Sequence, residues 1–143
     1  MIEKVRTILQ NPKFELDPDF DALGAKLKGG KDVRDDWETN LGSFALSYFE
    51  SFLDVLEREK FAEDELLREG LEEGVPKGVV HLRIVDELKE GYNEILLDDG
   101  ALVIQVIFRS RNFLGRDANS LQTTPDKWGT NINYAAQKLV DIL

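Results

Sequence analysis

Residues 78–109 read GVVHLRIVDELKEGYNEILLDDGALVIQVIFR, and this stretch decides the fold that we predict. From its start, apolar and polar residues alternate with a period of two, which is typical of a β-strand with one buried face. The apolar face carries Val80, Leu82 and Ile84, and the opposite face carries His81 and Arg83.

Two further strand-like runs, residues 94–97 and 101–109, flank Asp98-Asp99-Gly100. Asp-Gly is a strong hairpin signal because glycine readily adopts the positive φ that a tight turn needs. In the last run, Gln105 and Arg109 lie opposite the apolar face. The stretch therefore predicts a three-stranded antiparallel meander with a polar face.

Apolar residues at helical spacing predict helices on both sides of this strand region. A first short helix ends at Asn11-Pro12, and a second begins at Pro18 with Asp17 as its N-cap and Phe20 on its buried face. The longest helix, about 33–60 with Asp32 as its cap, carries a broad aromatic and aliphatic stripe and is predicted to be the core helix.

Two more helices complete the predicted fold. An acidic helix over about 62–73 is expected to bury Leu66, Leu67 and Leu71, and a C-terminal helix is expected over 132–143. The length of 143 residues is usual for one domain. We therefore predict a single α+β domain, 1–143, with N-terminal helices on the meander and a closing helix.

Composition excludes several classes of function. There is no cysteine, so disulfides and thiolate metal sites are excluded. The net charge is −10, which disfavours binding to nucleic acid or to an anionic membrane surface. The first residues are charged and lack the apolar run of a secretory signal, so we expect a cytoplasmic protein.

Four motifs suggest chemistry, but each lacks residues that the chemistry requires. Residues 25–32 resemble a phosphate-binding loop without its first glycine or its last Ser/Thr. Asp17, Asp19 and Asp21 have calcium-loop spacing, yet Ala22 and Lys28 replace the required glycine and glutamate. Because His81 is the single histidine, a zinc site that needs two imidazoles is excluded. No serine lies in a Gly-x-Ser-x-Gly turn, so His81 lacks the nucleophile of a Ser-His-Asp triad.

The fourth motif is a set of carboxylates, Asp98-Asp99 beside Asp86-Glu87, that could hold a metal ion. The neighbouring strand lacks the Glu-x-Lys that a metal-dependent nuclease would need, and turn formation accounts for Asp98 and Asp99. We therefore predict no metal, no cofactor and no catalytic residue, and favour a protein that is not an enzyme.

One segment differs in charge from the rest of the chain. Residues 109–143 hold 5 Lys and Arg against 3 Asp and Glu, whereas the remainder is strongly acidic. Its long irregular connection, about 109–130, is of a length usually associated with binding or disorder. Together with the polar strand face, it supplies the candidate binding residues: His81, Arg83, Arg109, Arg111, Arg116, Lys127, Trp128, Asn131 and Tyr134.

Two functions remain open. The leading hypothesis is a non-enzymatic protein–protein interaction module (a regulatory subunit, adaptor or inhibitor) that presents an acidic helical surface over 33–73 to a basic protein. The alternative is a domain that binds, or acts on, a small anionic metabolite through the arginine-rich loop and the open sheet face. A third interpretation is that the loop arginines form ion pairs with the acidic helices of the same molecule, in which case the loop has a structural role and no binding function. Self-association through the sheet or the Ser43–Ser47–Ser51 stripe is compatible with either function.

Overall fold

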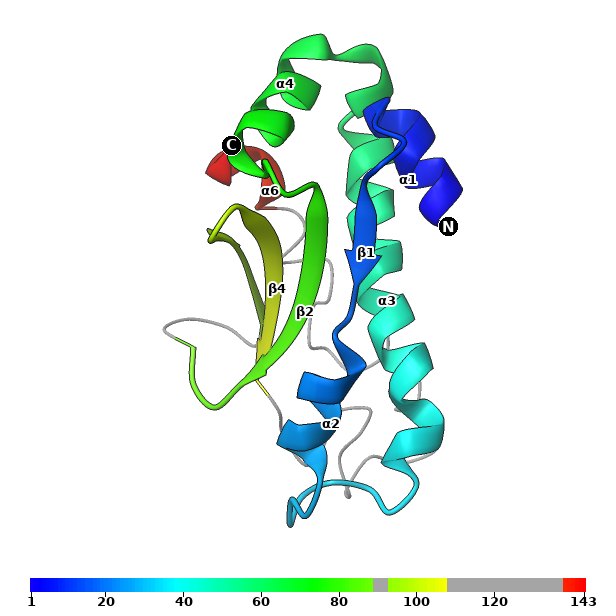
Figure 1. The fold of residues 1–143 in the computed structure, drawn as a ribbon, viewed down its shortest axis with the longest axis vertical. Coiled ribbons are helices and arrows are strands. Elements are labelled where there is room, and N and C mark those ends of the chain that lie inside the picture. The colour runs from blue at the N-terminus through cyan, green and yellow to red at the C-terminus, as the bar shows by residue number, and fades with distance from the viewer. Residues whose placement is uncertain (89–92, 108–137) are drawn as a thin grey trace.

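The structure, a computed structural model, describes residues 1–88, 93–107 and 138–143 (Figure 1). Within these ranges the chain forms helices and one sheet of four strands, so the α+β class is confirmed. The elements are α1 (Ile2–Leu9), β1 (Glu15–Asp17), α2 (Phe20–Leu27), α3 (Trp37–Arg58), the 3₁₀ turn η1 (Phe61–Glu63), α4 (Glu65–Gly74), β2 (Val79–Val85), β3 (Asn93–Asp98), β4 (Ala101–Ile107) and α6 (Leu139–Ile142).

The sheet is mixed, and the predicted antiparallel meander is wrong. The strand order is β1-β2-β4-β3, with β2 parallel to both β1 and β4. Strand β4 therefore lies between the two strands that precede it in the chain. The predicted hairpin is present: β3 and β4 are antiparallel, and Asp99 and Gly100 take φ values of 51° and 79° at its turn.

The sequence of β4 explains why it is internal. Leu102, Val103 and Ile104 are consecutive and each at most 1% exposed, so both faces of this strand are buried. Continuous apolar runs are typical of central strands with parallel neighbours, whereas strict alternation is typical of a strand with one solvated face. Alternation alone identifies which face is buried but does not give the order of the strands.

Strand β1 was not predicted from the sequence because it has only three residues between Pro12 and Pro18. It pairs in parallel with β2, with Leu16 opposite Val80. Its residue Asp17 does not cap the following helix as predicted. Instead, Asp19 caps α2 by accepting a hydrogen bond from the Ala22 amide at 3.3 Å, and Asp17 accepts one from the Asp19 amide at 2.9 Å.

The core lies between α3 and one face of the sheet. Figure 1 shows α3 running alongside the sheet, with α1 and α4 at one end and α2 at the other. Phe52 of α3 is fully buried and stacks on Phe14, with ring centroids 6.2 Å apart. The predicted apolar strand face and the predicted stripe of the long helix meet in this core, which includes Phe44, Phe52, Leu56, Val80, Leu82, Ile84, Leu102, Ile104 and Val106.

Two predicted helix features need correction, and a third is described only in part. Helix α3 begins at Trp37 rather than near 33, because Val33 is buried in the preceding turn and the N-cap is Asp36, not Asp32. Phe20 and Leu66 were expected to be buried but are 48% and 79% exposed, because each lies in the first turn of a short helix that packs through later residues. The described part of the predicted C-terminal helix is α6, and residues 132–137 lie outside the described residues.

The contrast between Phe52 and Leu66 gives a stability prediction. Phe52→Ala removes a fully buried ring and leaves a cavity, so it should lower the free energy of unfolding by about 3–5 kcal/mol in a denaturant titration. Leu66→Ala is the control and should change it by no more than about 0.5 kcal/mol. A comparable loss in both variants would contradict the described core.

Candidate functional site

The face of the sheet opposite the core carries a hydrogen-bonded row of polar side chains. Arg83, Gln105 and Glu94 occupy neighbouring positions on β2, β4 and β3. The Arg83 Nη1 donates to Gln105 Oε1 at 3.3 Å, and Gln105 Nε2 donates to Glu94 Oε1 at 3.1 Å. The sequence prediction that Arg83 and Gln105 share a face is therefore confirmed.

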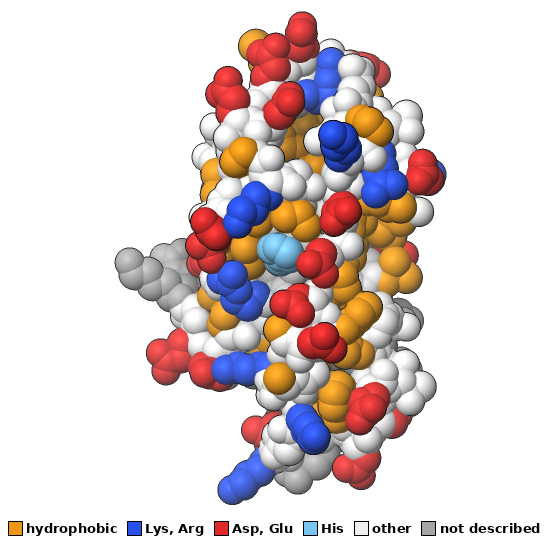
Figure 2. All heavy atoms as spheres, viewed as in Figure 1, with side chains coloured by type: hydrophobic (Ala, Val, Ile, Leu, Met, Phe, Trp, Pro, Cys, Tyr) orange, Lys and Arg blue, Asp and Glu red, His pale blue; other side chains and the backbone are white. Residues whose placement is uncertain are grey.

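Arg83 and His81 on this face each lie beside a carboxylate. Arg83 Nη2 lies 3.0 Å from Asp98 Oδ2. The Arg83 side chain reaches this carboxylate past the neighbouring row of paired residues, in which Val103 lies at the centre. His81 Nδ1 lies 3.4 Å from Asp17 Oδ2 and 3.3 Å from its carbonyl oxygen. Figure 2 shows the histidine near the centre of the exposed face, between acidic and basic side chains.

A hollow of about 310 Å³ adjoins this face where α2 meets β2. Lys26, His81 and Arg83 line it, which gathers three cationic or ionisable groups. Lys26 pairs with Asp86 at 2.8 Å, so all three have a partner within the molecule. A small anion would have to compete with these carboxylates, so the described geometry does not favour an anion site here.

Most of the predicted candidate residues lie outside the described residues. Only His81 and Arg83 are described, and both lie on the face of the sheet opposite the core. The remaining candidates are Arg109, Arg111, Arg116, Lys127, Trp128, Asn131 and Tyr134. Binding of a small anion through the loop therefore stays a prediction.

The described residues offer no metal centre. Over residues 1–88, 93–107 and 138–143, no three His, Asp or Glu side chains lie close enough to hold an ion. Arg34 and Lys77 lower the pKa of Asp36 and Asp99, and burial raises that of Tyr48. In the Ser43–Ser47–Ser51 stripe, the second and third hydroxyls donate to carbonyls four residues earlier in α3. None of these groups is arranged as a nucleophile with a base.

A second surface contains none of the predicted binding residues and is acidic. We call it the acidic end: the exposed side chains on the last turn of α3, on η1 and on α4. Figure 2 shows acidic side chains gathered at this end of the molecule (top). Its members are Glu57, Glu59, Glu63, Glu65, Leu66, Glu69, Glu72 and Glu73.

The carboxylates of the acidic end have no cationic partner in the described part of the chain. Arg58 pairs with Asp54 at 3.7 Å, outside this set. Arg68 donates from Nη1 to the carbonyl oxygens of Phe61 and Ala62, both at 2.7 Å, and so closes the turn between α3 and α4. Lys60 follows Glu59 and Arg68 lies on α4 itself, so cations adjoin the acidic end, but neither forms an ion pair with its carboxylates among the described residues.

Comparison with known proteins gives no assignment, since no family model, no curated protein and no solved structure matches the chain. Among the described residues, no helix is long and apolar enough to cross a membrane.

The engagement of Arg83 can be measured by a double-mutant cycle. Arg83→Met and Asp98→Asn should show a coupling of about 0.2–1 kcal/mol in unfolding free energy, since both side chains are nearly half exposed. The coupling should fall in 1 M NaCl because salt screens exposed charges. The matched cycle of Arg83 with the exposed Glu87 should show none, and equal couplings would contradict a specific pair.

Proposed function

We propose that this protein is a non-enzymatic protein–protein interaction module of the cytoplasm that binds a basic partner protein through its acidic end. A regulatory subunit, an adaptor or an inhibitor would act in this way. The observation that carries the proposal is the set of exposed carboxylates around Leu66 that form no ion pair among the described residues.

The charge pattern supports the proposal by contrast with the open sheet face. There, His81 and Arg83 have carboxylate partners within the molecule. On α4, Glu65 and Glu69 have none among the described residues, and their mutual repulsion costs stability that a cationic partner would restore. Complementary charge of this kind accelerates association and selects partners of the opposite sign.

Leu66 adds an apolar contact to this surface. Its side chain is 79% exposed in the first turn of α4, with Glu65 and Glu69 beside it on the helix. A single exposed leucine is common on protein surfaces. Within a ring of carboxylates, however, it matches the usual anatomy of an interface, in which an apolar centre is surrounded by a polar rim.

The proposal is tested by capture from the native lysate with tagged protein, read by mass spectrometry. We expect one basic protein to be retained at low salt and lost at high salt, because screening weakens exposed charge contacts. Glu65→Lys with Glu69→Lys should reduce its recovery at least tenfold.

The control is Glu38→Lys with Glu50→Lys, which makes the same charge change on exposed positions of α3 away from the acidic end. This variant should capture the partner as the wild type does. Equal losses in both variants, or capture that high salt does not weaken, would contradict the proposed surface.

A further inference from the structure

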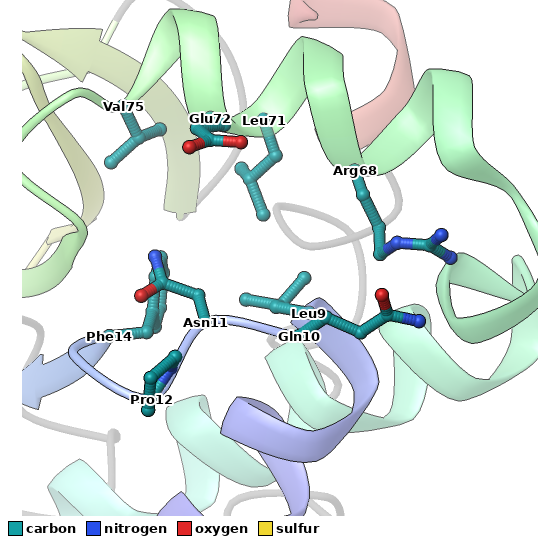
Figure 3. Close-up of a pocket in the computed structure, with 9 residues that line it drawn as sticks. All are labelled: Leu9, Gln10, Asn11, Pro12, Phe14, Arg68, Leu71, Glu72 and Val75. Atoms are coloured by element: carbon teal, nitrogen blue, oxygen red, sulfur yellow. The ribbon is translucent and has the colours of Figure 1, made fainter.

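A cavity of about 260 Å³ lies between α4 and the segment that joins α1 to β1, next to the acidic end. Figure 3 shows its two walls facing each other: Leu71, Glu72 and Val75 on the α4 side, and residues 9–14 on the other. Leu9, Phe14, Leu71 and Val75 are each at most 8% exposed, so they form an apolar floor rather than a rim.

Two polar side chains of this cavity have unused hydrogen-bonding capacity among the described residues. Glu72 makes no ion pair with any residue that the structure describes, although Arg68 lies one helical turn before it. The Arg68 guanidinium is held by the carbonyls of Phe61 and Ala62 and points away from Glu72 (Figure 3).

Asn11 is the second of these side chains. Its Oδ1 accepts a hydrogen bond from the Lys13 amide at 3.0 Å, which fixes the side chain, and its NH₂ group has no acceptor among the described residues. Figure 3 shows this amide pointing from its own wall toward α4. The cavity therefore combines an apolar floor, one carboxylate that is in no ion pair among the described residues and one fixed amide, with Arg68 at its edge held by the turn carbonyls.

We propose that this cavity receives an arginine side chain of the basic partner, an inference that rests on the proposed function. Ligand pockets usually occupy about 300–1,000 Å³, so a cavity of about 260 Å³ suits a side chain better than a cofactor. An arginine can lay its methylene stem on Leu9, Leu71 and Val75 while its guanidinium binds the Glu72 carboxylate. The Asn11 NH₂ would donate to a carbonyl oxygen of the partner's backbone.

Arginine is the occupant that the chemistry of the cavity selects. A carboxylate beside an apolar cavity floor is matched by a positively charged group at the end of an apolar chain. Among protein side chains, only arginine and lysine have this structure. Arginine binds a carboxylate through two parallel hydrogen bonds and is enriched at interfaces, whereas lysine is depleted there.

The test uses N-acetyl-L-arginine methylamide as the probe, titrated into ¹⁵N-labelled protein at low salt and followed by NMR. We expect shifts at the amides of Asn11, Glu72 and Val75, and saturation at one site. Glu72→Gln should raise the dissociation constant about tenfold, the scale expected for one charge-assisted pair. The uncharged citrulline analogue should not bind, and the lysine analogue should bind more weakly.

The matched control is Glu73→Gln, which removes the neighbouring exposed carboxylate that does not line the cavity. It should leave the dissociation constant unchanged. Equal weakening by Glu72→Gln and Glu73→Gln, or shifts spread over Glu65 and Glu69 instead of the cavity, would overturn this inference.

That failure is distinguishable from failure of the proposed function. Loss of the captured partner in the Glu65→Lys and Glu69→Lys variant, together with no probe binding at the cavity, would overturn only the arginine site. Probe binding at the cavity with no captured partner would overturn the interaction module and support the cavity's selection of a guanidinium.

Discussion

The burial of β4 on both faces is the constraint on which the other elements depend. Leu102 and Ile104 face the core helix, while Val103 between them is equally buried on the opposite face. A strand of this composition is stable only between two neighbours, so β2 and β3 must flank it. The end of β2 and the start of β3 are therefore two strand spacings apart, about 10 Å.

The position of β4 also determines the chemistry of the open face. Because Gln105 lies at its centre, Arg83 from one side and Glu94 from the other meet there in one hydrogen-bonded row. Arg83 also reaches Asp98 at the start of the hairpin turn. The polar residues of the sheet thereby satisfy one another, which makes this face a structural surface in the described part of the molecule.

The acidic end has the opposite organisation. The turn between α3 and α4 is closed by Arg68, whose Nη1 donates to the carbonyls of Phe61 and Ala62 instead of to a carboxylate of α4. The same closure orients α4 so that Leu71 and Val75 line the cavity opposite Leu9, while Leu66 faces solvent. One structural arginine thus closes the turn beside both the acidic end and the adjoining cavity.

The sequence by itself determined the features that depend on local periodicity and turn chemistry. These are the apolar face of β2, the buried stripe of α3, the hairpin at Asp99-Gly100 and the exclusion of cysteine chemistry. It could not give the strand order, the recruitment of Glu15–Asp17 as an edge strand or the exposure of Leu66. The tertiary structure decided these, and also which carboxylates lack a cation. The physical reason is that strand pairing, burial and charge compensation depend on neighbours distant in the chain, whereas periodicity records only which side of an element is apolar.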